Sequence, residues 1–164
     1  MLQATDLLKL RYMSDMTNSS RVFVLHVVFD QSLSSFCLWF VSFPDKLILI
    51  KENLMWSEAL RYCRQNHVDL VSVHSGEIQR RVMNVVKGAS TEAVWLGLRH
   101  SCTVGIWFWV SGETVCYHNW APGNGTSEED CEHAVRSGAV QSGGDQRWIS
   151  RPETDKLNFI CSRY

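Results

Sequence analysis

Six cysteines constrain the fold of this 164-residue chain more than any other feature of its sequence. None of them forms a C-x-x-C pair, and no two histidines have the spacing of a zinc site, so structural zinc and a thioredoxin-type redox motif are both disfavoured. Disulfide bonding is then the main interpretation, and it indicates an oxidising compartment: a secreted protein, or one on the extracellular face of the membrane. The cysteines are Cys37, Cys63, Cys102, Cys116, Cys131 and Cys161.

Composition and charge indicate one globular domain that neither binds nucleic acid nor catalyses a reaction. Hydrophobic residues make up 45% of the chain and charged residues 20%, close to the average for a folded protein. The net charge is -1, and no basic patch is interleaved with aromatic residues, which excludes a nucleic-acid partner. The histidines are scattered and no G-x-S-x-G nucleophile motif is present, so the sequence predicts a protein that is not an enzyme.

The first 44 residues differ in pattern from the rest of the chain. Their two apolar runs, Val22–Phe29 and Leu33–Phe43, are each shorter than the ~18 to 20 residues of a membrane span. Arg21 precedes the first run, as in a signal peptide, but no A-x-A-like cleavage site follows. We interpret residues 1–44 as a displaced signal or anchor, or as a mis-assembled start to the coding sequence, and residues 45–164 as the domain.

From residue 45 onward, hydrophobic periodicity predicts two helices followed by a strand-rich half. Apolar residues recur at helical spacing between Trp56 and Cys63, and Ser75 can cap a second helix that ends near Gly88. A long polar loop covers residues 119–130, and the whole order is typical of an α+β domain. The predicted strands are Leu47–Ile50, Val94–Leu98, Trp107–Val110, Glu113–Val115, Gln146–Ser150 and Leu157–Ser162.

Seven short motifs follow one another through this domain. They are W-S-E-A-L-R-Y-C at 56–63, W-L-G-L at 95–98, W-x-W-V-x-G at 107–112, Asn119-Trp120, Glu129-Asp130-Cys131, Trp148 and Phe159-Ile160-Cys161. One such motif alone is weak, but all seven in this order resemble the C-type lectin-like family. The resemblance implies a fold of two helices and two small antiparallel sheets, with W-L-G-L as a central strand and a long loop region that carries the binding surface.

The resemblance also implies a disulfide between Cys63 and Cys161 that closes almost the whole domain. The family's second bridge would join Cys131 to a cysteine at the position that Glu153 occupies. Cys131 therefore lacks its usual partner, and we expect the side chain of Glu153 to point to solvent.

The other cysteines leave alternatives open. Cys102 and Cys116 lie on either side of the strand predicted at 107–110, so we predict a local cross-link between them. Cys37 and Cys131 then remain, and they pair with each other, link two chains into a covalent dimer, or stay free.

Sugar-binding members of the family hold their ligand through a calcium ion in the long loop, and calcium requires six to eight oxygen ligands. At the positions that supply these oxygens the chain has Ala121-Pro122-Gly123 and Ile149-Ser150, which leaves Glu129 as the retained carboxylate. One carboxylate is not a calcium site, so we expect no cofactor and binding without calcium. The alternative is a calcium site that the neighbouring acids and amides rebuild after the loop has shifted.

The candidate ligand contacts lie in the long loop and beside it. Two tryptophans flank the loop, and an aromatic ring with a polar edge suits a contact surface. Asn18-Ser19-Ser20 and Asn124-Gly125-Thr126 are predicted glycosylation sites. The candidate contacts are Trp120, Asn124, Glu128, Glu129, Asp130 and Trp148.

These observations predict an extracellular recognition module, a secreted disulfide-bonded glycoprotein that binds a glycan or a cell-surface or extracellular protein without calcium. The first alternative is a calcium-dependent carbohydrate-binding lectin with a rearranged loop. The second, from another class, is an interaction domain that Cys37 or Cys131 links into covalent dimers.

Overall fold

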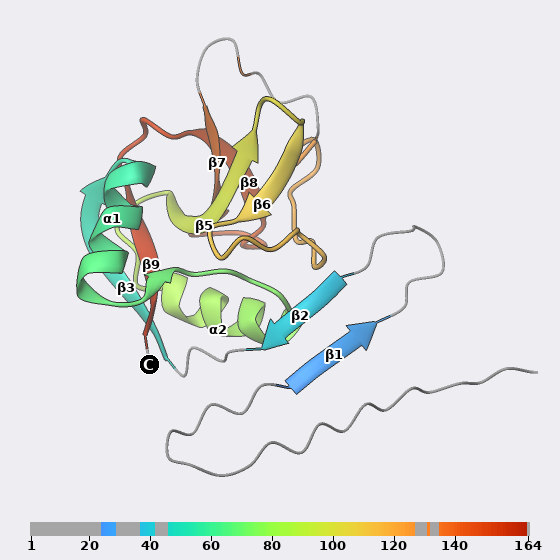
Figure 1. Cartoon of the computed structure of the whole chain (residues 1–164). Helices are drawn as coiled ribbons and strands as arrows, with labels where there is room; N and C mark the ends of the chain where they lie inside the picture. The colour runs from blue at the N-terminus through green and yellow to red at the C-terminus, as the bar shows by residue number, and fades with distance from the viewer. Residues whose placement is uncertain (1–23, 29–36, 42–45, 127–130, 132–134, 164) are drawn as a thin grey trace, which may run out of the picture.

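The computed structural model describes residues 46–126, 131 and 135–163, together with the backbone of two short strands that precede them (Figure 1). These strands, β1 (Val24–Val28) and β2 (Cys37–Val41), pair antiparallel and overlap the two apolar runs of the N-terminal segment. None of the helices in the described residues has the length and hydropathy that crossing a bilayer requires.

One mixed sheet of seven strands organises residues 46–163. Five strands lie in the order β3-β9-β5-β7-β8, while β4 pairs with β9 and β6 pairs with β5. The pairing of β3 with β9 brings the two ends of this part of the chain together, as Figure 1 shows beside the label C. The strands are β3 (Lys46–Leu54), β4 (Asp69–Leu70), β5 (Ala93–Ser101), β6 (Ile106–Trp109), β7 (Arg136–Gln141), β8 (Trp148–Pro152) and β9 (Leu157–Arg163).

The α+β class is confirmed, but the prediction of two small antiparallel sheets is wrong, because β5 joins both halves. Near its start, β5 pairs parallel with β9 through Val94 and Trp95. The register of its pairing with β7 shifts between Trp95 and Leu98, and from Leu98 onward β5 also pairs antiparallel with β6. A β-bulge of this kind bends the strand, so a single nine-residue strand can serve both ends of the sheet.

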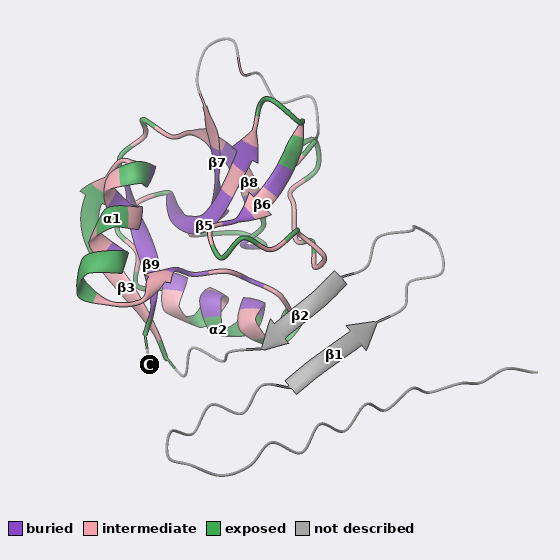
Figure 2. Ribbon diagram, viewed as in Figure 1, coloured by how far each residue is buried: buried purple, intermediate pink, exposed green. Residues whose placement is uncertain are grey.

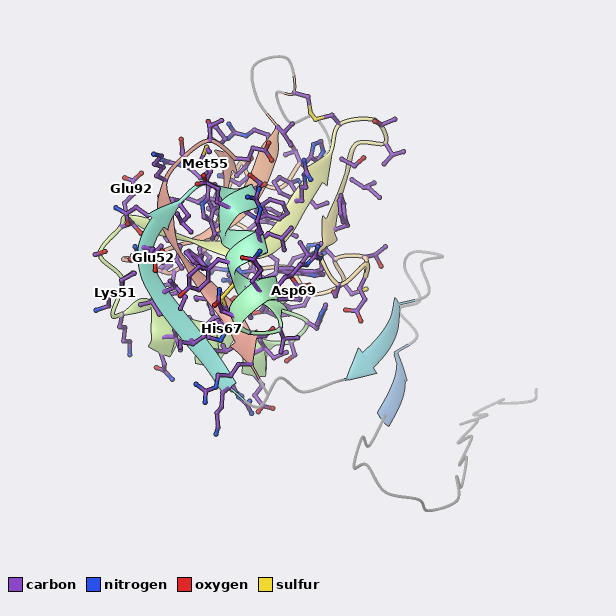
Figure 3. The ribbon with its side chains drawn as sticks, turned by 60° about the vertical axis from the view of Figure 1, so that its left-hand side comes forward. Lys51, Glu52, Met55, His67, Asp69 and Glu92 are labelled. Atoms are coloured by element: carbon purple, nitrogen blue, oxygen red, sulfur yellow. A yellow bond between two sulfur atoms is a disulfide. The ribbon has the colours of Figure 1, made fainter. Side chains whose placement is uncertain are left out.

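Helix α1 (Trp56–Asn66) begins where the sequence predicts and buries Trp56, Ala59 and Cys63 against the sheet. The backbone N–H of Met55 donates to the Glu58 carboxylate (3.0 Å), which satisfies a donor at the start of the helix. Figure 3 shows α1 beside β3, with Met55 at its start and His67 just beyond its end.

Helix α2 (Gly76–Val86) confirms the predicted cap, because the Ser75 hydroxyl accepts from the backbone N–H of Ile78 (3.3 Å). Its buried face consists of Gln79, Val82 and Val86. Ile78 is only partly buried, whereas Gln79, a polar residue that periodicity assigns to no apolar face, is 3% exposed.

The core lies on both faces of the sheet because side chains alternate along β5. Trp95 packs with Trp56 and Phe159 on one face, and Leu96 packs with the residues around Trp148 on the other. Figure 2 shows in purple that buried residues dominate β5. The glycine that follows Leu96 is required by the packing around it. A Cβ at Gly97 would lie 2.7 Å from Cγ2 of Val110 and 2.8 Å from the carbonyl oxygen of Leu70, so only glycine fits there.

The disulfide expected between Cys63 and Cys161 is present and joins α1 to β9 with both sulfurs fully buried. Its Cα atoms are 5.4 Å apart, and 98 residues of sequence separate the two cysteines. Closing a loop of that length in the unfolded chain stabilises the fold by about 4 to 5 kcal/mol in the chain-entropy model.

The predicted bridge between Cys102 and Cys116 is wrong, because Cys102 is bonded to Cys131. Strand β6 lies between the two predicted partners: Ser101 pairs with Ile106 on one side of β6, and Thr114 pairs with Phe108 on the other. Two strand spacings amount to about 10 Å, which exceeds the ~7 Å that a disulfide can span between Cα atoms. Cys116 is also disulfide-bonded, but not to Cys102.

The expectation that Glu153 points to solvent is also wrong. Its Oε2 atom is buried and lies 3.5 Å from Nη2 of Arg99. The Arg99 guanidinium is in turn held over the ring of Trp56, 5.3 Å from the ring centroid. An ion pair therefore lies at the position where the family's second disulfide would be.

Candidate ligand-binding site

The long loop leaves the core at Trp120 and returns to it at Cys131, and the structure describes its residues up to Thr126. Its first residues run beside β8: the N–H of Ala121 donates to the carbonyl of Trp148, and the N–H of Trp148 donates to the carbonyl of Asn119, both at 2.8 Å. These backbone bonds give the start of the loop a fixed position at the edge of the sheet.

Trp148 is excluded as a ligand contact, contrary to the sequence-based prediction. It is 0% exposed, and its Nε1–H donates to Oε1 of Gln79 on α2 (2.8 Å). The ring packs edge-on against both Trp109 and Trp120, at centroid distances of 5.3 and 5.6 Å. Its indole N–H and its rings are therefore used within the core.

Trp120 is half-buried, and most of its contacts are internal. The centroid of its ring lies 4.7 Å from that of the Trp107 ring. The Nε1–H of Trp107 in turn donates to the carbonyl of Thr126 (3.2 Å). Gly125 lies so close to the Trp120 ring that a Cβ there would be 2.2 Å from Cδ2. The returning loop thus covers part of Trp120, and only the remainder can contact a ligand.

Asn124 holds the loop to β8. Its Oδ1 accepts from the backbone N–H of Ser150 (2.9 Å), and its Nδ2 donates to the carbonyl of Pro122 (3.3 Å). The side-chain oxygen that a calcium ion would need is therefore turned toward the protein backbone. Glycosylation of Asn124 stays a prediction, and Asn18 lies outside the described residues.

A cationic side chain lies at one of the family's calcium positions. The Arg136 guanidinium donates from Nε to the hydroxyl of Ser150 (2.9 Å) and from Nη2 to the carbonyl of the same residue (2.8 Å). Both the side-chain and the carbonyl oxygen of Ser150 are therefore used within the protein. Ala121 and Gly123 offer no side-chain oxygen, and the predicted contacts Glu128, Glu129 and Asp130 lie outside the described residues.

An open depression of about 570 Å³ lies beside the start of the loop, between Ala121-Pro122 and the β7–β8 turn. It carries charges of both signs, from Arg147, Asp145 and Glu92. Arg147 donates to Oδ1 of Asn119 (3.1 Å), which directs its guanidinium toward the loop. Sequence reasoning missed this surface, because its lining residues come from three separate segments. They are Glu92, Ala121, Pro122, Gln141, Gly143, Gly144, Asp145 and Arg147.

A titratable pair elsewhere in the domain does not form a hydrolase site. Nε2 of His74 lies 2.7 Å from Oε2 of Glu113, and the Ser111 hydroxyl donates to the same carboxylate oxygen (3.4 Å). Burial nevertheless lowers the pKa of His74 to about 4, and burial also raises the pKa of Glu113. Glu113 stands between the serine and the histidine, so His74 is not placed to take the serine proton.

His100, Cys102 and Cys131 bring potential metal-ligating atoms within 4.8 Å of one another. The two sulfurs are bonded to each other, and only a thiolate is a metal ligand. This group therefore holds no metal while the disulfide is intact.

The chain is similar to known proteins over most of this domain. The family model for the lectin C-type domain matches residues 52–163. The human low affinity immunoglobulin epsilon Fc receptor is 38% identical over 117 residues, which make up 69% of this chain and 33% of the receptor. The C-type lectin lectoxin-Lio1 of Erythrolamprus poecilogyrus is 30% identical over 116 residues, 69% of this chain and 70% of that protein.

Solved structures agree with the fold. Human lithostathine superposes with a TM-score of 0.60 at 27% identity, covering 70% of this chain and 88% of its own. The lectin CEL-I of Cucumaria echinata superposes with a TM-score of 0.60 at 23% identity, covering 70% and 86%, and supports the fold alone.

Proposed function

Because the chain belongs to the C-type lectin domain family, we propose that residues 45–164 form an extracellular recognition module that binds a glycan or protein ligand without calcium. The observation that carries this proposal is the pair of hydrogen bonds from the Arg136 guanidinium to Ser150. In the family's calcium-binding members this position supplies an oxygen to the ion, and here a side-chain cation uses it instead.

The rest of the donor set supports the same proposal. Ala121 and Gly123 replace oxygen-bearing side chains, and the Asn124 oxygen accepts from the Ser150 N–H. Calcium needs six to eight oxygens, so the described residues supply far too few.

We assign the depression beside the loop to ligand contact, together with the accessible part of Trp120. Asp145 and Arg147 are exposed at its rim, where they offer an acceptor and a donor to hydroxyl, amide or charged groups. Glu92 is paired with Arg151 (2.8 Å) and lies at the surface, as Figure 3 shows. Glu128, Glu129 and Asp130 stay proposed contacts of the same loop.

Binding screens with and without calcium test the proposal. The protein is screened against arrays of glycans and of extracellular proteins, once in chelator and once in calcium, and the same ligand is expected at the same strength in both buffers. Replacing Asp145 or Arg147 by alanine should weaken the affinity for that ligand by about tenfold, a typical loss when a charged residue contacts the ligand directly. Arg163→Ala is the control, because Arg163 lies on the β3–β9 pair, at the opposite edge of the sheet from β8. Binding that disappears in chelator would instead establish the calcium-dependent lectin.

The disulfides narrow the proposal of a covalent dimer. A link through Cys131 is ruled out, because Cys131 is bonded to Cys102 of its own chain. The side chain of Cys37 lies outside the described residues, so a link through Cys37 stays a proposal, which a non-reducing gel tests by the presence of a band at twice the chain mass.

A further inference from the structure

The two disulfides whose cysteines both belong to the described residues, Cys63–Cys161 and Cys102–Cys131, differ in accessibility. Cys63 and Cys161 are both 0% exposed, inside the packing between α1 and β9. Cys102 lies in the turn after β5 and is exposed, and its partner Cys131 is half-buried. Thiol–disulfide exchange requires an attacking sulfur to reach one sulfur of the bridge, so Cys102 is the accessible point of attack.

A buried histidine contacts the other sulfur of the accessible bridge. His100 is 3% exposed, and its Nδ1 lies 3.6 Å from Sγ of Cys131. The ring is held against Trp107, with centroids 5.2 Å apart. Nε2 of His100 has no hydrogen-bond partner within the described part of the chain.

The position of the His100 proton follows from these contacts. A disulfide sulfur has no proton to donate, so Nδ1 can make this hydrogen bond only as the donor. Were Cys131 to leave the bridge as a thiolate, the same N–H would point at a full negative charge and the hydrogen bond would become charge-assisted and stronger. His100 therefore favours Cys131 as the leaving group, and accessibility favours Cys102 as the attacked sulfur.

We propose that the Cys102–Cys131 bridge is a thiol–disulfide exchange site that an extracellular dithiol reductant opens through Cys102, with His100 stabilising the departing sulfur of Cys131. One thiolate of the reductant attacks Sγ of Cys102, the bond between Cys102 and Cys131 breaks, and Cys131 leaves as a thiolate. The second thiol of the reductant then attacks its own mixed-disulfide sulfur and releases Cys102. Two electrons pass to the bridge, the reductant becomes a disulfide, and its two protons end on Cys102 and Cys131.

Opening this bridge removes a covalent link between two parts of the domain. Cys102 belongs to the β5–β6 turn and Cys131 to the far end of the long loop, 29 residues away in sequence. The hydrogen bond from the Trp107 indole to the Thr126 carbonyl (3.2 Å) is a second connection between β6 and the loop that does not involve the bridge. The exchange chemistry is independent of which ligand the domain binds, and it can be tested without one.

The experiment follows each cysteine of the native, full-length protein during reduction. The oxidised chain is treated with reduced thioredoxin, or with dithiothreitol, without denaturant, then alkylated and mapped by mass spectrometry. Cys102 and Cys131 should be alkylated about tenfold or more faster than Cys63 and Cys161, the buried internal control. Equal rates for the two pairs would overturn the proposal.

The direction of attack and the role of His100 have separate readouts. With glutathione, a monothiol, the trapped mixed disulfide should lie on Cys102, and this measurement needs no variant. A mixed disulfide found mainly on Cys131 would refute the assigned direction. His100→Gln should slow the reduction of the Cys102–Cys131 bridge about tenfold and leave the reduction of Cys63–Cys161 unchanged. The matched control, His118→Gln, changes an exposed histidine and should affect neither rate. Unaltered opening in a folded His100→Gln protein would contradict the role of the imidazole.

Discussion

Replacing Gln79 by methionine tests whether a buried hydrogen bond joins α2 to the strand that anchors the long loop. Methionine has nearly the volume of glutamine but accepts no strong hydrogen bond, so the Nε1–H of Trp148 would remain buried without a partner. The carbonyl of Gln146, which Gln79 also contacts, keeps its bond from Nδ2 of Asn119 (3.2 Å). The substitution therefore leaves one buried donor, the Trp148 indole N–H, without a partner and leaves no buried acceptor unpaired.

An orphaned buried donor costs about 1 to 3 kcal/mol. The unfolding entropy of globular proteins is about 2.1 cal/mol/K per residue, so for about 120 residues each kcal/mol corresponds to about 4 °C in Tm. The Gln79→Met protein should therefore melt about 4 to 12 °C below the wild type, as measured by circular dichroism or calorimetry. Arg80→Met is the matched control on the exposed face of α2 and should stay within about 0.5 kcal/mol. If both variants melted together with the wild type, the bond between Gln79 and Trp148 would contribute nothing, and the reasoning would be refuted.

Two further predictions concern packing and pH. Gly97→Ala should cost about 1 to 3 kcal/mol in urea unfolding, because its Cβ would lie 2.8 Å from the fixed carbonyl of Leu70, and an unchanged midpoint would contradict the close packing. Burial lowers the pKa of His74 from 6.5 to about 4, so the unfolded chain binds more protons between these values and the wild type loses up to about 3 kcal/mol as pH falls through them. Burial raises the pKa of Glu113, which gives the opposite slope just above 4.5 in the wild type and in His74→Gln alike. The free energy of unfolding of the wild type, measured relative to that of His74→Gln, should therefore fall from pH 6.5 to pH 4. A constant difference between the two would show that His74 titrates normally.

Local patterns in the sequence were sufficient for the helices, and the resemblance to the family was sufficient for the closing disulfide. Apolar spacing and the Ser75 cap fix the two helices, because both signals act within one or two turns. The Cys63–Cys161 bridge followed from the order of motifs that the chain shares with its family. The continuous sheet could not be predicted, because the parallel pairing of Val94 with Asn158 joins residues that no local pattern relates.

The site was less predictable because its decisive contacts are made across the fold. Nothing in the sequence signals that Arg136 bonds to Ser150, since the two residues meet only when β7 lies beside β8. Burial also explains why the prediction for Trp148 is wrong. Its place beside the long loop suggests a ligand contact, but the core encloses it completely. Cys102 is bonded to Cys131 because the long loop returns to the β5–β6 turn. The spacing of the cysteines in the sequence does not predict that return.

We propose that the long loop holds no calcium ion, and a calcium titration of thermal stability tests this proposal most directly. A ligand that binds only the folded state stabilises it by RT ln(1 + [L]/Kd), or about 2.7 kcal/mol at a hundredfold excess over Kd. At about 4 °C per kcal/mol, a functional calcium site would raise Tm by about 10 °C between chelator and millimolar calcium. We predict superimposable melting curves in the two buffers, because both oxygens of Ser150, at a position where the family's ion would be coordinated, accept from the Arg136 guanidinium instead. A calcium-induced rise of that size would contradict this account and show that oxygens elsewhere in the loop have rebuilt the site.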